Sequence, residues 1–229
     1  MKRIGILGGT SPESTVSYYT RITHEHTRRF GNVAFPEILI YSVSFQSFVD
    51  WSAAGEWDAI AAAMSNAFDR LAAAGAQVGL IAANTLHRVF DEVAASCPIP
   101  LLHIVEPTAL AIRAAGLTRV GLLGTRYTME EPFYAERLAR HGLSPLVPDR
   151  PARDEIHRII YEELTRGVLQ AEAKAFTLSV IQDLASQGAQ GIILGCTELP
   201  LLVTPQDTAL PLFDTAILHA DAALDAALR

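Results

Sequence analysis

The sequence predicts an α/β fold built from two related halves, each containing a parallel β-sheet. Short runs of apolar and β-branched residues alternate with longer segments of helical periodicity, which is typical of βαβ units. Several of these runs are apolar throughout, which indicates strands buried on both faces of a sheet. An internal repeat then relates one half of the chain to the other.

Each predicted strand precedes a turn or a segment with helical spacing. The first helix is marked by Ser11, which can cap free amides, and by Pro12, which fits the first helical position. Strands are expected at Arg3–Gly8, Glu37–Ser42, Val78–Ala82, Leu101–Ile104, Arg119–Leu123, Gly191–Leu194 and Pro211–Phe213. Helices are expected at Pro12–Arg29, Trp57–Ala73, Met129–Arg140, Asp154–Thr165, Ala171–Ser186 and Thr215–Leu228.

The repeat defines the expected domain organisation. Gly75–Thr85 reappears in altered form as Gly188–Glu198, and Ile4–Gly8 matches Val120–Gly124. Ligands of open α/β sheets bind beyond the carboxyl ends of the strands, so we expect an active site in the cleft between the two halves. The first lobe is expected to comprise residues 1–103 with 209–229, and the second residues 104–208.

The composition argues against several classes of protein. The 229 residues carry a formal net charge of -7 without a basic cluster, so no nucleic-acid partner is expected. No apolar stretch approaches the ~18 residues of a membrane span, and a strand predicted from Arg3 leaves no room for a signal peptide. Cys97 and Cys196 are too few for a disulfide framework and fit a reducing compartment. We therefore expect a cytoplasmic protein without a membrane partner.

Small polar residues follow four of the predicted strands. Such turns offer backbone N–H groups and hydroxyls to an anion, although any single one could be an ordinary helix cap. Their glycines match neither the dinucleotide-binding pattern nor a P-loop. Together the turns favour a site for a small anionic molecule. They are Gly8–Pro12, Ala83–Thr85, Gly124–Thr128 and Cys196–Glu198.

Cys196 is the candidate nucleophile or base. It follows a predicted buried strand and precedes a predicted helix start at Thr197, where amides would lower the pKa of the thiol and favour the thiolate. The alternative is that it is a small buried hydrophobe, which is the interpretation we give to Cys97.

Neither pyridoxal phosphate nor a metal is expected. An imine-forming lysine is needed for the former, and the two lysines, Lys2 and Lys174, do not end strands. His24 and His26 point to different faces of a helix. The other candidate ligands, His87 and His103, lack a carboxylate or cysteine at ligand spacing.

A family resemblance comes from four segments of the chain. They are Gly8–Thr15, Asn84–His87, Tyr161–Gly167 and Gly195–Pro200. Together they resemble the cofactor-independent aspartate/glutamate racemases over nearly the whole chain. The resemblance implies two lobes related by pseudo-twofold symmetry, often in a homodimer. It also implies an isomerase without a cofactor, in which two thiols face the α-carbon of an acidic amino acid from opposite sides.

One position departs from the family pattern. Cys196 aligns through the repeat with Ala83, where the family has its first cysteine, and a methyl group cannot transfer a proton. Alanine could replace a cysteine or hydroxyl residue of the natural chain. A neighbour such as Thr85, His87 or a bound water could instead act on the first face. The third explanation is a one-thiol enzyme, resembling the arylmalonate decarboxylases, whose single cysteine reprotonates a carbanion.

The resemblance also implies substrate contacts. Arg166 stands where the family often has a basic residue for the distal carboxylate, a role that suits a guanidinium; the alternative is a cation at a helix C-terminus. Glu198 either stabilises its helix or orients the amino group. The carboxylates and amino group are expected to be held by Thr10, Ser11, Asn84, Thr85, Thr125, Thr128 and Thr197.

Three functions follow from these observations. The first is a racemase of aspartate or glutamate that uses Cys196 and Thr85 as catalytic residues and is impaired or one-sided because of Ala83. The second is a one-thiol decarboxylase or isomerase of a small dicarboxylic acid. The third is a non-catalytic protein that retains the anion site.

Overall fold

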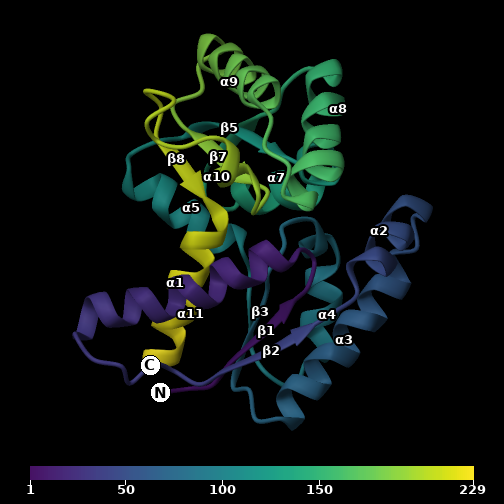
Figure 1. Cartoon of the computed structure of the whole chain (residues 1–229), viewed down its shortest axis with the longest axis vertical. Helices are drawn as coiled ribbons and strands as arrows, with labels where there is room; N and C mark the ends of the chain where they lie inside the picture. The colour runs from purple at the N-terminus through teal and green to yellow at the C-terminus, as the bar shows by residue number, and fades with distance from the viewer. The chain divides into compact units, whose positions relative to one another are not determined.

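The computed structural model describes residues 1–229 as two compact units, each with its own parallel sheet (Figure 1). The boundary differs from the expected one, which assigned residues 209–229 as a whole to the first lobe. Strand β8 (Leu212–Asp214) pairs in parallel with β7 (Ile192–Gly195), and this pairing keeps β8 in the second unit. The first unit comprises Met1–Ile104 and Ala216–Arg229, and the second Val105–Thr215.

The first sheet has the strand order β2-β1-β3-β4, and every neighbouring pair is parallel. Strands β1 and β3 are buried along their whole length, as their continuous apolar sequences predict. The edge strand β2 is partly exposed. The bounds are Ile4–Gly8 for β1, Ile38–Ser42 for β2, Val78–Ile81 for β3 and Leu101–Leu102 for β4.

Helices cover both faces of this sheet. On one face α1 and α11 pack against Ile4 and Ile6, and on the other α3 packs against Leu7 and Ile81. Helix α2 was not predicted, because Ser44 before it makes no capping hydrogen bond and Phe45 follows β2 almost directly. The helices are α1 (Pro12–Phe30), α2 (Phe45–Ala54), α3 (Trp57–Ala73), the 3₁₀ turn η1 (Thr85–Val89), α4 (Phe90–Ser96) and α11 (Thr215–Leu228).

An ion-pair network joins α1 to α11, although the two helices are far apart in the sequence. Arg21 donates two hydrogen bonds to Asp221, at 2.7 and 2.6 Å. The carboxylate of Glu25 is 3% exposed and accepts from Arg28 and Arg29, and Arg29 also pairs with Asp225. These guanidinium groups lower the pKa of Glu25 to about 2. The last helix is thereby held to the first.

The second sheet repeats the topology of the first, with the order β6-β5-β7-β8 and all pairs parallel. The register confirms the repeat in structural terms: Leu7 pairs with Ile81 in the first sheet, as Leu123 pairs with Leu194 in the second. The remaining strands are β5 (Arg119–Gly124) and β6 (Ser144–Leu146).

Two expected helices of the second unit differ from those observed. The expected helix Met129–Arg140 is divided, because Glu131 adopts an extended conformation before Pro132. The expected helix Asp154–Thr165 starts earlier and widens into a π-helical turn, η2, before a 3₁₀ turn, η3. No helix is both long and apolar enough to cross a membrane. The helical elements are α5 (Val105–Ala114), α6 (Arg126–Glu130), α7 (Pro132–Ala139), α8 (Arg150–Arg158), η2 (Ile159–Glu163), η3 (Leu164–Arg166), α9 (Ala171–Ser186) and α10 (Leu199–Leu202).

Candidate active site

The turn after β1 is held rigidly to the end of β3. Ser11 accepts a hydrogen bond from the backbone N–H of Ser14 at 3.2 Å, and the Ser14 hydroxyl donates to the carbonyl of Ala82 at 2.7 Å. Beside them Thr10 is 8% exposed, and its hydroxyl oxygen is buried without a hydrogen-bond partner. A buried unsatisfied hydroxyl is costly, so Thr10 is the residue of this turn that most needs a ligand.

The turn after β3 contains Ala83, Asn84 and Thr85. The strand registers of the two sheets make Ile81 the equivalent of Leu194. Ala83, two residues after Ile81, therefore corresponds to Cys196, two residues after Leu194. The ring of His87 is fixed beneath this turn: Nδ1 donates to the Ala83 carbonyl at 2.8 Å, and Nε2 accepts from the N–H of Ile104 at 3.1 Å.

These two bonds have a consequence for catalysis. They use both ring nitrogens of a neutral imidazole, so His87 orients the turn and has no nitrogen left for a substrate proton. The suggestion that His87 acts on the first face is therefore not supported by this geometry. Asn84 is buried, and Thr85, which begins η1, is partly exposed.

In the second unit, Thr125 and Thr128 lie together at the end of β5. Thr125 caps α6 by accepting from the N–H of Thr128 at 3.4 Å, and the two hydroxyl oxygens are 3.3 Å apart. Both side chains are buried. The expectation of a polar turn at this strand end is thus met by two hydroxyls on one helix start.

The sulfur of Cys196 lies next to the carboxylate of Glu198. Its Sγ donates to Oε2 of Glu198 at 2.9 Å, and the Thr197 hydroxyl donates to the same oxygen at 2.9 Å. Cys196 is 7% exposed and packs against Leu199 and Leu202. Sequence reasoning gave Glu198 little weight, because only the rotamer of its side chain brings the carboxylate onto the sulfur.

The expected lowering of the Cys196 pKa is wrong in this structure. Burial and the Glu198 carboxylate together raise the pKa of Cys196 well above its ordinary range, while the amides of Thr197 and Glu198 act in the opposite direction. Helix α10 has only four residues, so its dipole is weak against a charge at bonding distance. Cys196 is consequently a thiol, ready to donate a proton.

Arg166 is exposed at the end of η3, immediately before Gly167, and makes no hydrogen bond or ion pair. This position fits a helix C-terminal cation, and it leaves the guanidinium available for a carboxylate. Sequence reasoning missed Glu163, which is 6% exposed, accepts from Arg158 at 2.8 Å and leaves Oε2 without a partner. The π-helical turn that holds it was not detectable from hydrophobic spacing.

No group of three or more His, Cys, Asp or Glu side chains is placed to hold a metal ion. The hydroxyls and amides at the strand ends provide hydrogen-bond donors for carboxylates, and the thiol of Cys196 is a group able to transfer a proton.

Comparison with known proteins identifies the family. The family model described as Asp/Glu/Hydantoin racemase matches residues 7–223. A Yersinia pestis protein, solved as a candidate Asp/Glu racemase, is 44% identical over 100% of both chains with a TM-score of 0.92. An aspartate racemase homologue from Pyrococcus horikoshii OT3 is 37% identical over 100% of both chains with a TM-score of 0.85. The broad specificity amino-acid racemase RacX of Bacillus subtilis is 25% identical over 93% of this chain and 92% of its own. The chain therefore belongs to the Asp/Glu/hydantoin racemase family.

Proposed function

We propose that this protein is a cofactor-independent enzyme that moves a proton at the α-carbon of an acidic amino acid, aspartate or glutamate. The observation that carries the proposal is the buried Cys196–Glu198 pair with its 2.9 Å contact. A sulfur that donates to a carboxylate can deliver a proton to carbon and can also pass that proton to the carboxylate. The names of the related racemases support the amino-acid substrate.

The reaction begins with a proton transfer within this pair. The proton of Cys196 passes to Glu198, which becomes a carboxylic acid and leaves a thiolate. The thiolate then takes the α-proton of the amino acid and becomes a thiol again. The electron pair of the broken C–H bond is left on the α-carbon and delocalises into the substrate carboxylate. The Cys196 thiol exchanges its hydrogen with solvent and returns one to the α-carbon, and Glu198 then gives its proton back to the thiolate.

The strand-end residues supply the binding groups in this proposal. Thr10, with its unsatisfied hydroxyl, is the best supported of them. Hydroxyl and amide donors would stabilise the charge that grows on the substrate carboxylate. Arg166 would take the distal carboxylate by two parallel hydrogen bonds. The other proposed contacts are Ser11, Asn84 and Thr85 in the first unit and Thr125, Thr128 and Thr197 in the second.

Ala83 limits what the first face can do. Racemisation needs a proton donor on each face of the planar carbanion, and only Cys196 is a thiol at a strand end. Thr85 or water is the remaining group for the first face. We therefore propose that exchange of the α-hydrogen with retained configuration is faster than inversion.

Incubation in heavy water tests this function. L- and D-aspartate and glutamate are followed for α-deuterium by NMR and for configuration by chiral chromatography. We expect deuterium in one enantiomer and little inversion, loss of exchange in Cys196→Ala, and faster inversion in Ala83→Cys. An absence of deuterium in every amino acid offered would refute the proposed function.

A second candidate, decarboxylation of a substituted malonate, is favoured by the same thiol. Loss of carbon dioxide leaves a carbanion that needs only a proton donor, and the Cys196 thiol, whose pKa is raised, provides one without a second base. The carbanion takes the proton of Cys196, and solvent returns a proton to the sulfur. Carbon dioxide release from methyl- or phenylmalonate, without amino-acid exchange, would establish this candidate instead. A protein that binds aspartate and does neither would be a non-catalytic relative.

A further inference from the structure

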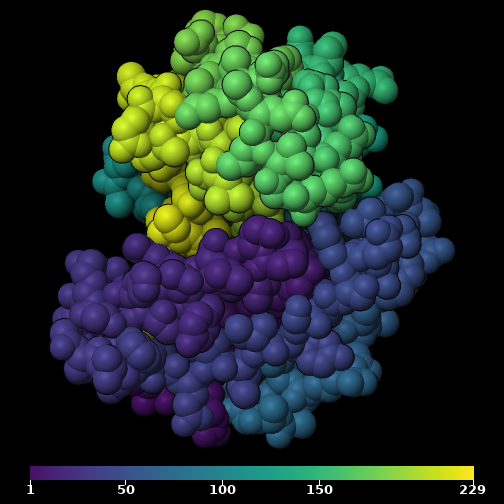
Figure 2. All heavy atoms as spheres, in the orientation of Figure 1, coloured from purple at the N-terminus to yellow at the C-terminus, as the bar shows by residue number.

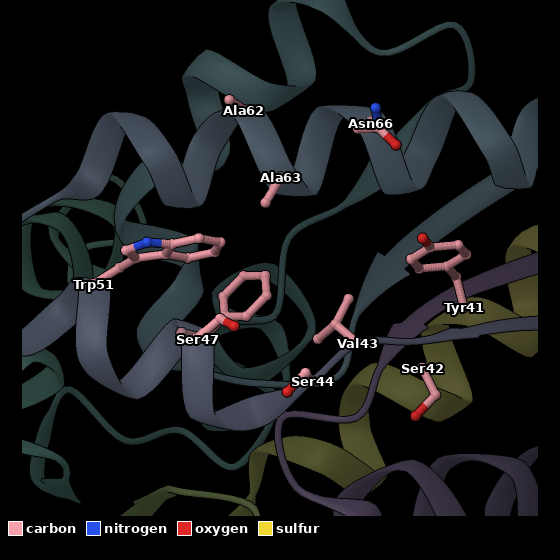
Figure 3. A pocket seen from close by; sticks show the side chains of 10 residues that line it. Tyr41, Ser42, Val43, Ser44, Ser47, Trp51, Ala62, Ala63 and Asn66 are labelled. Carbon is pink, nitrogen blue, oxygen red and sulfur yellow. The ribbon is translucent and has the colours of Figure 1, made fainter.

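A cavity of about 550 Å³ lies in the first unit, where β2 ends, and is bounded by α2 and α3 (Figure 3). Tyr41 and Trp51 stand at opposite ends of it, and Ser47, Val43 and Ala63 lie between them (Figure 3). Part of α2 lies on the surface in the space-filling view (Figure 2), whereas Phe48 and Ser52 are buried. We refer to this cavity as the aromatic groove.

The walls of the aromatic groove are apolar and aromatic, with a few hydroxyls. Phe48 and Trp51 meet edge to face, with ring centroids 5.5 Å apart. The hydroxyls of Ser42, Ser44 and Ser47 have no hydrogen-bond partner in the protein, and Ser44 does not use its hydroxyl to cap α2. A few polar groups on apolar walls are typical of small-molecule sites.

The groove is also uncharged. No lining residue carries a charge. The neighbouring cation, Arg70, lies 5.6 Å from the centre of the Tyr41 ring and donates Nε to Oδ1 of Asn66 at 2.8 Å. The guanidinium of Arg70 is therefore already engaged with Tyr41 and Asn66, two residues that line the groove. A carboxylate in this groove would lose water without gaining a dedicated cation, whereas a ring would gain contacts with Trp51 and Phe48.

The groove begins beside the turn that contains Thr10 and Ser11. The N–H of Val43, a lining residue, donates to the Gly8 carbonyl at 3.0 Å, and Gly9 lies so close to Ser42 and Val43 that a Cβ atom would collide with them. Neighbouring strands are only about 4.8 Å apart. A long side chain on an amino acid held at the β1 turn can therefore reach the groove, and the short side chain of aspartate cannot fill it.

We propose that the aromatic groove binds the uncharged side chain of an amino acid, and that the substrate range includes aromatic amino acids such as phenylalanine. This inference rests on the proposed function, because the amino acid must be one whose α-carbon the protein acts upon. Trp51 and Phe48 supply the stacking surface, Ala63 on α3 leaves the space, and the free hydroxyls bind water or a polar ring substituent.

The first test compares substrates and variants by α-deuterium exchange. Ala63→Leu places a larger side chain in the groove, and Ser47→Leu does so from α2. We expect each to lower the ratio of phenylalanine exchange to aspartate exchange by roughly tenfold or more, since most of the burial of one ring is lost. Ala53→Leu is the matched control, because Ala53 is an exposed residue of α2 outside the groove, and it should leave the ratio unchanged.

The second test measures binding independently of catalysis. Trp57→Phe leaves Trp51 as the single tryptophan, so its emission reports on the groove. We expect phenylalanine to change this emission, and the change to be lost when Ala63→Leu is added.

The outcomes separate the two proposals. If no amino acid exchanges but phenylalanine still changes the emission, the proposed function fails and the groove remains a ligand site. If aspartate exchanges while phenylalanine neither exchanges nor changes the emission, this inference is overturned and the proposed function stands. Emission that responds to glutamate alone, and no longer does so in Arg70→Gln, would also overturn it.

Discussion

Replacing Glu198 by glutamine should raise the rate at which Cys196 is alkylated and lower the rate of amino-acid exchange. The sulfur and Oε2 of Glu198 are 2.9 Å apart, and the carboxylate raises the pKa of Cys196 both through its charge and through the hydrogen bond. A like charge at this distance disfavours the thiolate. Glu198→Gln removes that charge and keeps the size of the side chain.

The expected magnitude follows from two opposing effects. Each unit by which the thiol pKa falls multiplies the thiolate fraction by about ten, while the nucleophilicity of the thiolate falls by about a factor of three. The net gain in alkylation is therefore roughly threefold for each unit by which the pKa falls. Amino-acid exchange should fall at the same time, because an amide cannot accept the proton of Cys196.

Iodoacetamide labelling near neutral pH, followed by mass spectrometry of the peptide that contains Cys196, measures this effect separately from Cys97. The rate is compared with that of the original protein and of Glu172→Gln, an exposed carboxylate at the start of α9. Unchanged or slower labelling of Cys196 in Glu198→Gln would show that the carboxylate does not hold the proton on sulfur. The mechanism would then have to begin from a thiolate.

Three further predictions concern stability. Burial lowers the pKa of His219 from 6.5 to about 4, so the folded state disfavours the protonated ring. The free energy of unfolding should therefore fall by at most about 3 kcal/mol as the pH drops from about 6.5 to about 4. Urea titrations should show a flatter pH dependence of stability in His219→Gln. The pKa of Glu25 is lowered to about 2. Its contribution to the free energy of unfolding is therefore complete above about pH 4.5 and is lost as the pH falls toward 2. Glu25→Gln should cost roughly 1–3 kcal/mol near neutral pH, and a loss no larger than that of the exposed control Glu13→Gln would contradict the network. Gly9→Ala should lower the free energy of unfolding, measured by heat or urea, by roughly 1–3 kcal/mol. Gly9 has φ +91, and a Cβ added there would collide with the backbone of Val43. Unchanged stability would mean that the turn relaxes at no cost.

The central strands were predictable because burial on both faces leaves an unmistakable apolar run. Strands β1, β3, β5 and β7 all lie within or close to their expected ranges. Strand β6 was missed, since it is a three-residue edge strand that contains Pro145 and is only partly buried. A periodic pattern also could not show that Pro132 divides one expected helix into α6 and α7.

The strand-end position of Cys196 was predictable, whereas its electrostatics were not. The place of Cys196 at a strand end follows from the repeat, and the equivalence with Ala83 follows from the same alignment. The pKa of Cys196 depends on where the Glu198 side chain turns, which no spacing rule specifies. The pairing of His87 with residues 83 and 104 is likewise a tertiary contact, and it changes His87 from a candidate acid into a support for the turn.

The return of α11 to the first unit has a consequence for biosynthesis. Ala220, Ala223 and Leu224 complete the cover of the sheet face that includes Ile4 and Ile6, so this face is covered only in part, by α1, until α11 has been made. The second unit, by contrast, is continuous and can complete its sheet before synthesis ends. A nascent chain stalled before α11 would leave part of the apolar face of β1 exposed to solvent.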